Sequence, residues 1–224
     1  MKIVITGSEG LVGKRLVKDL SSKYEIIKLD LKFGHDLTDE KFISNFFKKE
    51  KPIYGLIICH GLNPQKNTKF VNNPLTLNTN SINYYLETNL ISPFNLCRHF
   101  IKNNKKGKII TISSLYGMVS PKHFLYENSF KHIGYCLSKS SIIMMTKYLA
   151  TLYAKNFNIN TVILGGVINK NINKKFVKSY STASPKKRMM TIKETTGIFD
   201  FLLSEKSSYA TGGVFTIDGG WTSW

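Results

Sequence analysis

Acidic residues and arginine are scarce in this chain of 224 residues. Aspartate and glutamate number 14 against 32 lysines and arginines, which gives a formal net charge of +18 at pH 7. Such a charge is compatible with a nucleic-acid partner, but only Arg15, Arg98 and Arg188 are arginines, the residues that usually make bidentate contacts to bases and phosphates. The other 29 basic residues (32 minus 3) are lysines spread along the whole chain. We therefore expect no nucleic-acid partner.

Cysteine and long apolar runs are also in short supply. Cys59, Cys97 and Cys136 are odd in number and far apart in apolar surroundings, so buried free thiols explain them better than disulfides or a metal site. No apolar run approaches the ~20 residues that cross a bilayer, and the chain enters a strand directly after Met1, which leaves no room for a signal peptide. We expect no metal, no membrane association and a cytoplasmic location.

Strand-like and helix-like segments alternate along the chain, which indicates one α/β domain over residues 1–224. Alternation of this kind favours a doubly wound parallel sheet of about seven strands with helices on both faces. The clearest strands are expected at 2–6, 25–30, 54–61, 108–114, 160–164 and 213–218, and the helices at 14–20, 39–50, 83–103, 135–156 and 191–203. Residues 62–82 are expected to form a loop, and the aperiodic, lysine-rich residues 169–190 a mobile substrate lid.

The first strand runs into a glycine turn that opens a helix. Gly7 allows a tight turn, Gly10 lets the backbone approach a pyrophosphate, and Gly13 allows close packing of the helix, whose N-terminus faces the anion. This order of strand, turn and helix predicts a dinucleotide site. Its turn comprises Gly7, Ser8, Glu9, Gly10, Leu11 and Val12.

Asp30, at the end of the second strand, bears on the choice between NAD and NADP. A carboxylate there accepts hydrogen bonds from both adenosine ribose hydroxyls and repels a 2′-phosphate, which favours NAD. The basic residues Lys14, Arg15 and Lys32 nearby leave NADP open.

Two later segments are also expected at the cofactor. Asp36, next to Leu37, either contacts the adenine or caps the following helix together with Thr38. His60 and Gly61 end the central strand, and ligands bind at the carboxyl ends of strands in open α/β sheets.

Tyr135 and Lys139 are four residues apart in the expected helix 135–156, so they share one helical face. An ammonium group near a phenol favours the phenolate and should lower the pKa of the tyrosine towards the working pH, as a general acid/base requires. Considered alone, the pair is better explained as a coincidence on a solvated helix surface.

Two polar residues are unusual for their positions. Asn89 lies inside an expected helix, where asparagine is unfavourable, so it is either exposed or holds a kink and a water near an active site. Ser114 ends a central strand and can reach the same cavity as Tyr135, although turn chemistry also explains a serine three residues before Gly117.

These motifs occur in a fixed order. They are Thr6-Gly7 with Gly10 and Gly13, Asp30, Asn89, Ser114-x-x-Gly117, Tyr135-x-x-x-Lys139, Gly166 and Asp218-Gly219-Gly220. From Thr6 to Gly220 the chain resembles the short, single-domain members of the short-chain dehydrogenase/reductase family. The resemblance implies a Rossmann-like fold and an NAD(P)(H)-dependent oxidoreductase that interconverts an alcohol and a carbonyl.

The resemblance also implies a role for each residue of the tetrad. Tyr135 exchanges the proton with the substrate oxygen, and Ser114, which suits this role better than Ser113, positions that oxygen. Lys139 binds the nicotinamide ribose and lowers the pKa of Tyr135. Asn89 holds a water that links Lys139 to solvent.

Three features depart from the family pattern. The glycine spacing is that of the longer nucleotide-sugar epimerases and dehydratases. The family's Asn-Asn-Ala-Gly is Ile-Cys-His-Gly at 58–61, which loses the amides that brace the central strand. Gly165-Gly166 replaces Pro-Gly and Lys170 replaces a threonine, so we expect backbone groups of Ile168 to hold the carboxamide end of the cofactor. Nucleotide-sugar epimerisation or dehydration, and a non-catalytic cofactor-binding protein, are therefore kept as alternatives.

Substrate choice is expected to depend on residues 120–132 and 169–190. Their basic and aromatic content suggests a small, polar molecule, neutral or anionic, such as a sugar or nucleotide-linked sugar, against the alternative of a merely solvated lid. The first segment carries His123, Phe124, Tyr126 and His132, and the second Lys170, Lys174, Lys175, Lys178, Lys186, Lys187 and Arg188.

The helix expected at 135–156 is apolar on two sides. Ile142, Thr146, Leu149 and Tyr153 are expected to face the sheet, which leaves Met145, Tyr148 and Leu152 on a second stripe. An exposed apolar stripe indicates a partner, and members of the resembled family commonly associate through this helix. We expect a homodimer or homotetramer.

Overall fold

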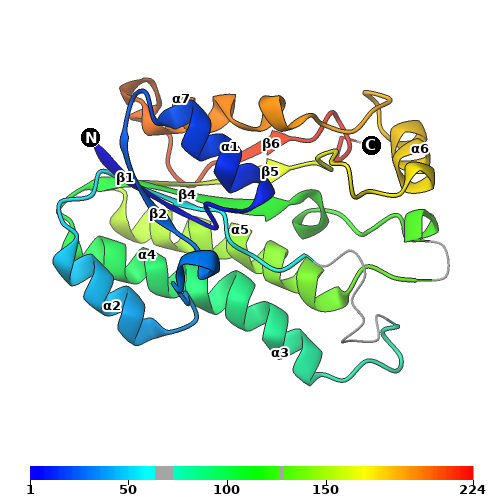
Figure 1. Ribbon diagram of the computed structural model, residues 1–224, viewed down its shortest axis with the longest axis horizontal. Coiled ribbons are helices and arrows are strands. Elements are labelled where there is room, and N and C mark those ends of the chain that lie inside the picture. Colours follow the sequence, from blue (N-terminus) through cyan, green and yellow to red (C-terminus); the bar gives the residue numbers. More distant parts are fainter. Residues whose placement is uncertain (64–72, 127–128, 224) are drawn as a thin grey trace.

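The computed structural model describes residues 1–63, 73–126 and 129–223. These residues contain one six-stranded sheet of parallel strands in the order β2-β1-β3-β4-β5-β6, with helices on both faces (Figure 1). The expected doubly wound, Rossmann-like α/β fold is confirmed, and six strands are compatible with the expectation of about seven.

The sheet has its switch point between β1 and β3, because the chain pairs β2 on one side of β1 and then crosses to build the rest of the sheet on the other. In such sheets the crevice beyond the carboxyl ends of the strands at the switch point binds ligands. In Figure 1 these ends point to the right, towards α6 and the start of α5. The strands are β1 Lys2–Thr6, β2 Glu25–Leu29, β3 Gly55–Ile58, β4 Gly107–Ser114, β5 Phe157–Leu164 and β6 Val214–Ile217.

Alternate residues of each strand point to opposite faces, and the two faces bury different helices. Val4 packs in a core with the helices α2, α4 and α5, whereas its neighbours Ile3 and Ile5 pack in another with α1 and α7. The helices are α1 Leu11–Leu20, α2 Glu40–Lys49, α3 Asn80–Leu86, α4 Ser92–Asn103, α5 Ile133–Tyr153, α6 Lys174–Ala183 and α7 Gly197–Leu203. No helix in the described ranges is both long and apolar enough to span a membrane.

Short helical turns connect several of these elements. The segment η2, Glu87–Ile91, is π-helical and joins α3 to α4 into one nearly continuous helix. The remaining turns are 3₁₀-helical: η1 Leu31–Phe33, η3 Leu115–Gly117, η4 His123–Tyr126, η5 Ile192–Thr195 and η6 Glu205–Ser207.

Most element boundaries shift by a few residues, but three expectations are corrected. Of the expected loop 62–82, residues 64–72 lie outside the described residues, and α3 already begins at Asn80. The segment 169–190 was expected to be aperiodic but contains α6, whose partly buried Phe176 and buried Tyr180 are one helical turn apart between exposed lysines. Tyr153, expected to face the sheet, is 38% exposed because α5 ends there.

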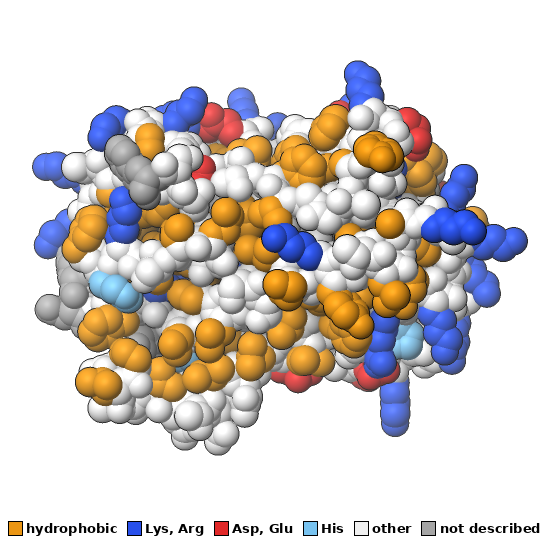
Figure 2. Space-filling view, turned by 180° about the vertical axis from the view of Figure 1, so that it is seen from behind, with side chains coloured by type: hydrophobic (Ala, Val, Ile, Leu, Met, Phe, Trp, Pro, Cys, Tyr) orange, Lys and Arg blue, Asp and Glu red, His pale blue; other side chains and the backbone are white. Residues whose placement is uncertain are grey.

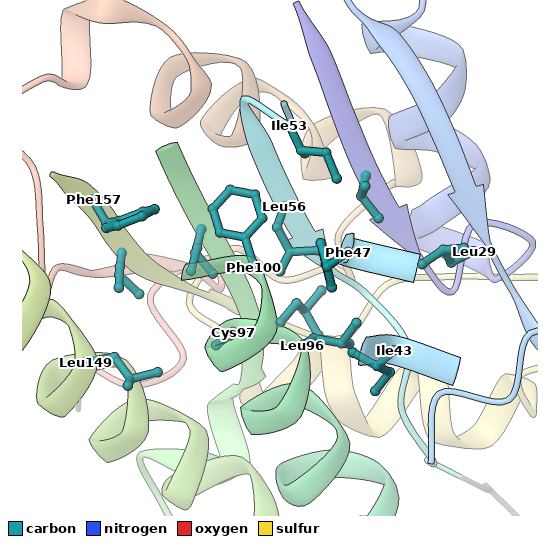
Figure 3. Packing of buried hydrophobic residues seen from close by; sticks show 14 of the residues in the cluster. Leu29, Ile43, Phe47, Ile53, Leu56, Leu96, Cys97, Phe100, Leu149 and Phe157 are labelled. Carbon is teal, nitrogen blue, oxygen red and sulfur yellow. The ribbon is translucent and has the colours of Figure 1, made fainter. Parts of the chain in front are cut away.

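An aromatic cluster fills the core between the sheet and α2 and α4 (Figure 3). The ring of Phe100 meets those of Phe47 and Phe157 edge to face, each with centroids 6.0 Å apart. A Cβ on Gly107 would lie 2.7 Å from the Phe100 ring, so the start of β4 has no space for a side chain. Phe100 therefore fixes where α4 sits on the sheet.

The substitution Phe100→Ala should lower the free energy of unfolding by about 3–5 kcal/mol, because it leaves a cavity in the packed cluster. Urea unfolding followed by circular dichroism measures this difference. Phe124→Ala is the matched control, since Phe124 is 67% exposed and its loss should change stability by no more than about 0.5 kcal/mol. Equal effects of the two substitutions would contradict this account of the core.

Candidate active site

A cavity of about 1200 Å³ opens at the carboxyl ends of the strands. It exceeds the roughly 300–1000 Å³ of a site for one small ligand and runs from the glycine turn to α6, so it has room for a dinucleotide and a second molecule. Many of the residues singled out in the sequence line it: Gly7, Gly10, Leu11, Val12, His60, Gly61, Ser114, Tyr135, Lys139 and Gly166.

Six predicted cofactor residues lie outside this lining: Ser8, Glu9, Asp30, Asp36, Leu37 and Ile168. Leu37 is buried in the core beneath β1 and β2. The exposed carboxylate of Asp36 accepts hydrogen bonds from the backbone N–H and hydroxyl of Thr38 (2.8 and 2.7 Å), while α2 is capped by Asp39 rather than by Asp36. The N–H of Ile168, expected to hold the cofactor, already donates to the Met190 carbonyl at 2.8 Å.

The glycine turn is packed so tightly at Gly7 and Gly13 that neither position has space for a side chain. Gly7 has φ +60°, which favours glycine, and a Cβ on Gly13 would lie 2.1 Å from the Gly7 carbonyl oxygen. The turn also buries the hydroxyl of Ser8, which has no hydrogen-bond partner among the described residues. A turn that holds an unpaired buried hydroxyl is suited to a polar ligand.

The far end of the turn is acidic. The Asp30 carboxylate accepts a hydrogen bond from the Glu9 backbone N–H at 2.8 Å. The Glu9 side chain forms an ion pair with Lys14 at 3.2 Å, and Arg15 pairs with Asp19 at 2.8 Å. Two of the basic residues that left NADP open therefore have carboxylate partners.

Tyr135 and Ser114 are both buried and share a side-chain hydrogen bond in the cavity. Burial raises the pKa of Tyr135 to about 12, and the bond with Ser114 opposes this only in part. The expectation that Lys139 lowers this pKa is wrong for this structure. The Lys139 Nζ lies 6.0 Å from the ring centre and donates to the Ile112 carbonyl at 3.0 Å, and burial lowers its own pKa to about 8.

The structure distinguishes the two serines at the end of β4. Ser113 Oγ donates to the Lys139 carbonyl at 2.6 Å, so its hydroxyl holds α5 against the strand. A Cβ on Gly117 would come within 2.7 Å of both of these oxygens, which explains the glycine. The Ser114 hydroxyl is the one bonded to Tyr135.

Asn89 lies in the π-helical turn, and the alternative that it is solvent-exposed is wrong. Its side chain is buried and bonds both backbone groups of Leu62, at 2.7 and 3.1 Å, and the Ser138 hydroxyl at 3.1 Å. A Cβ on Gly61 would lie 3.1 Å from Asn89 Oδ1 and 3.5 Å from Lys139 Nζ. Asn89 therefore ties the segment after β3 to α5 beside Lys139, and such π-turns occur often at functional sites.

The side chain of His60 braces the central strand, a function that the sequence was expected to lack because it has no amide side chains there. Its ring nitrogens lie 2.8 Å from Thr6 Oγ1 and 2.9 Å from Ser92 Oγ. Thr6 Oγ1 already accepts the N–H groups of Cys59 and His60, so it donates to Nδ1, and Nε2 carries the proton that faces Ser92. The imidazole thus joins β1, β3 and α4. Burial lowers its pKa to about 4.

Sequence reasoning missed several cavity residues, of which Lys131 is the most unusual. Its Nζ lies 4.2 Å from the centre of the Tyr135 ring and donates to the Asn63 amide oxygen. The available signal was its position four residues before Tyr135. In the predicted substrate segment 120–132, Tyr126 lines the cavity, Phe124 points to solvent, His132 caps α5 through the Gly134 N–H, and residues 127–128 lie outside the described residues.

Comparisons with known proteins agree with this architecture. A family model described as enoyl-(acyl carrier protein) reductase matches residues 2–222. Post-translational flagellin modification protein A of Campylobacter coli is 30% identical over 98% of this chain and 97% of its own length. The 3-oxoacyl-(acyl-carrier-protein) reductase FabG of Buchnera aphidicola is 31% identical, over 65% of this chain and 59% of its own length. A short chain dehydrogenase from Leptospira borgpetersenii, crystallised with NAD+, has a TM-score of 0.85 at 28% identity and covers 99% of this chain and 92% of its own.

The neutral His60 predicts an acid-sensitive fold. Its pKa is about 4 in the folded chain against 6.5 ordinarily. Between pH 6.5 and pH 4 the imidazole is therefore protonated in the unfolded chain but still neutral in the folded one. The stability that His60 contributes is therefore complete above pH 6.5 and falls as the pH falls towards 4, by up to about 3 kcal/mol. Urea unfolding between pH 7.5 and 4.5 should show a smaller loss for His60→Asn than for wild type. The exposed His123, changed to Asn, should leave the wild-type slope unchanged; identical slopes for all three would refute the assignment.

Proposed function

Because the chain belongs to the short-chain dehydrogenase/reductase family, we propose that Ser114, Tyr135, Lys139 and Asn89 carry its chemistry and that its substrate is a sugar or nucleotide-linked sugar. As a member of this family, the chain is an oxidoreductase that interconverts an alcohol and a carbonyl with a nicotinamide cofactor. The observation that carries the proposal is that the buried side chains of Tyr135, Ser114 and Lys139 line one cavity that also reaches the glycine turn.

The turn fits a dinucleotide. Its backbone leaves no space for side chains at Gly7 and Gly13, and the buried Ser8 hydroxyl lacks a partner among the described residues. Gly7 to Val12 would hold the pyrophosphate, and His60, Gly61 and Gly166 would line the site further along. When bound, the nicotinamide supplies or accepts the hydride.

We favour NAD over NADP. The Asp30 carboxylate is held at the end of the turn by the Glu9 backbone N–H, and there it would accept hydrogen bonds from ribose hydroxyls and repel a 2′-phosphate. Lys14 and Arg15, the basic residues closest in sequence, already pair with Glu9 and Asp19.

The proton is handled by Tyr135. A phenol with a pKa near 12 is fully protonated at neutral pH, so it donates its proton to a substrate carbonyl oxygen in reduction and takes it back in oxidation. Ser114, bonded to the same phenol, positions that oxygen. Lys139, whose ammonium lies between Tyr135 and Gly61, would bind the nicotinamide ribose hydroxyls, and Asn89 holds the wall beside it.

A polar substrate fits the rest of the cavity. The hydroxyls of Tyr116 and Tyr126 are joined by a 2.9 Å hydrogen bond in its wall. Asn169 and Asn173 also line it; their amide oxygens accept backbone N–H groups, which leaves their amide nitrogens as donors. Such a wall offers several hydrogen bonds to the hydroxyls of a sugar.

Replacing Tyr135 by Phe should reduce turnover at least about 10²–10⁴-fold, because it removes the proton donor, while the affinity for NADH stays within about threefold. A sugar panel followed at the nicotinamide absorbance, and NADH and NADPH titrations by fluorescence, measure the two effects. Tyr209→Phe, at a fully exposed residue, is the control. A Tyr135→Phe enzyme that keeps its rate would overturn the proposal, and turnover without net change of the cofactor would instead identify an epimerase or dehydratase.

We also propose that the chain forms a homo-oligomer through α5. An apolar stripe on this helix is exposed at Leu137, Met144, Tyr148 and Leu152, by 43–66% of each residue's surface, and Figure 2 shows hydrophobic side chains gathered in a band on this side of the molecule. The stripe differs from the expected one in that Met145 packs into the core and Met144 is exposed instead. A face of this kind is typical of a buried interface.

The double substitution Met144→Glu with Tyr148→Glu should convert the oligomer to a monomer, because two charges would be buried in the interface without partners. Light scattering at micromolar concentration should give a mass of about one chain for this variant and a multiple of it for wild type. Tyr209→Glu should leave the mass unchanged. A monomeric wild type would remove the proposal.

A further inference from the structure

Lys131 places a second ammonium group in the cavity, and none of the roles above uses it. Its Nζ lies 4.2 Å from the centre of the Tyr135 ring, closer than that of Lys139 at 6.0 Å. The next residue, His132, is buried, stacks on Tyr85 with centroids 4.5 Å apart, and caps α5. The backbone of Lys131 is therefore anchored, and its side chain is directed at the phenol.

This ammonium has no carboxylate partner in the described part of the chain. Its contacts there are the Asn63 amide oxygen and the face of the Tyr135 ring, which are weaker partners for a charge than a carboxylate is. The described lining of the cavity contains two lysines, Lys131 and Lys139, and neither aspartate nor glutamate. Lys139 is buried and Lys131 is partly buried, and two such cations without a counter-charge are costly unless a ligand supplies one.

The surroundings favour an anion as well. The helix α6 forms one wall of the cavity through Asn173, Phe176 and Tyr180. Six exposed lysines lie on and around this helix, so the field at this end of the molecule attracts negative ligands. These exposed residues are Lys170, Lys174, Lys175, Lys178, Lys186 and Lys187.

We propose that Lys131 binds an oxyanion, a carboxylate or a phosphate, that the sugar substrate carries next to its reacting carbon. The position follows from the shared neighbour: Tyr135 gives its proton to the oxygen on the reacting carbon, and Lys131 lies against the same ring. A group near the far end of a nucleotide-linked sugar would not reach both. This inference rests on the proposed function of Tyr135 and narrows the substrate to an acidic sugar.

The alternative role for Lys131 is a structural one, in which it acts on every substrate through Tyr135. Three ketoses with the same reacting carbon separate the two roles. These are 2-ketogluconate, with a carboxylate beside C2, fructose 1-phosphate, with a phosphate one carbon away, and fructose, which is neutral. The variants are Lys131→Met, which removes the charge, Lys131→Arg, which keeps it, and Lys206→Met as a control on η6 at the surface.

With NADH as the reductant, wild type should reduce at least one charged ketose more efficiently than fructose. Lys131→Met should lower kcat/KM for that ketose about 10–100-fold, mainly through KM, as expected for a lost charged hydrogen bond, with less than about threefold change for fructose. Lys131→Arg should retain most of the efficiency. The charged ketose that responds identifies carboxylate or phosphate. Equal losses for all three ketoses, or a preference for fructose, would overturn the inference.

A binding measurement keeps the inference testable if none of these ketoses is reduced. Calorimetry on the NADH-loaded protein should show gluconate binding at least about tenfold more tightly than glucitol, and Lys131→Met should abolish the difference. Charge-dependent binding without turnover would count against the proposed function and for the anion site. Turnover without charge dependence would count against the anion site alone, as would equal binding of gluconate and glucitol.

Discussion

The register between α5 and the end of β4 is the constraint on which the site depends. It is set by buried hydrogen bonds at three successive residues of the strand: Thr111 to Thr146 at 3.0 Å, Ile112 to the Lys139 ammonium at 3.0 Å, and Ser113 to the Lys139 carbonyl at 2.6 Å. A slip of the helix by one residue would leave these polar groups buried and unpaired, at a cost of about 1–3 kcal/mol each. Because this register is fixed, Ser114 meets Tyr135 and Lys139 lies behind the phenol.

The opposite wall is fixed by a second set of polar side chains with determined partners. His60 ties the ends of β1 and β3 to α4, and Asn89 ties the segment after β3 to α5. His60 lies directly beneath the glycine turn, since a Cβ on Gly7 would strike its backbone at 2.7 Å. The two walls share α5, so the turn and the phenol form one rigid unit. Networks in which every group is satisfied give this kind of rigidity.

The fold was predictable because it depends on periodicity, which is a local property of a sequence, and the order of motifs in the resembled family led to Ser114, Tyr135 and Lys139, which line one cavity. The burial of a side chain depends on residues far away in the sequence, and the predictions that were wrong are those that depended on burial. The pKa of Tyr135 rises because the ring is enclosed, a fact that its spacing to Lys139 does not contain. The bracing by His60 depends on Thr6 and Ser92, which are far from it in the sequence. The lysines of α6 obscured its helical periodicity in the sequence. Lys131 could not be distinguished from the other lysines, 29 in all (32 minus 3), because its position next to Tyr135 depends on the fold.

The cavity between the two walls carries positive charge that no carboxylate of its described lining balances. Burial lowers the pKa of both Lys131 and Lys139 to about 8, so each ammonium is held close to the pH at which it loses its proton. An anionic ligand between them would favour the charged forms and raise both pKa values, so that above pH 8 its binding would be coupled to proton uptake. The same anion would raise the pKa of the neutral Tyr135 further, and the phenol would stay protonated. A protonated phenol in this position can donate its proton to a bound carbonyl oxygen.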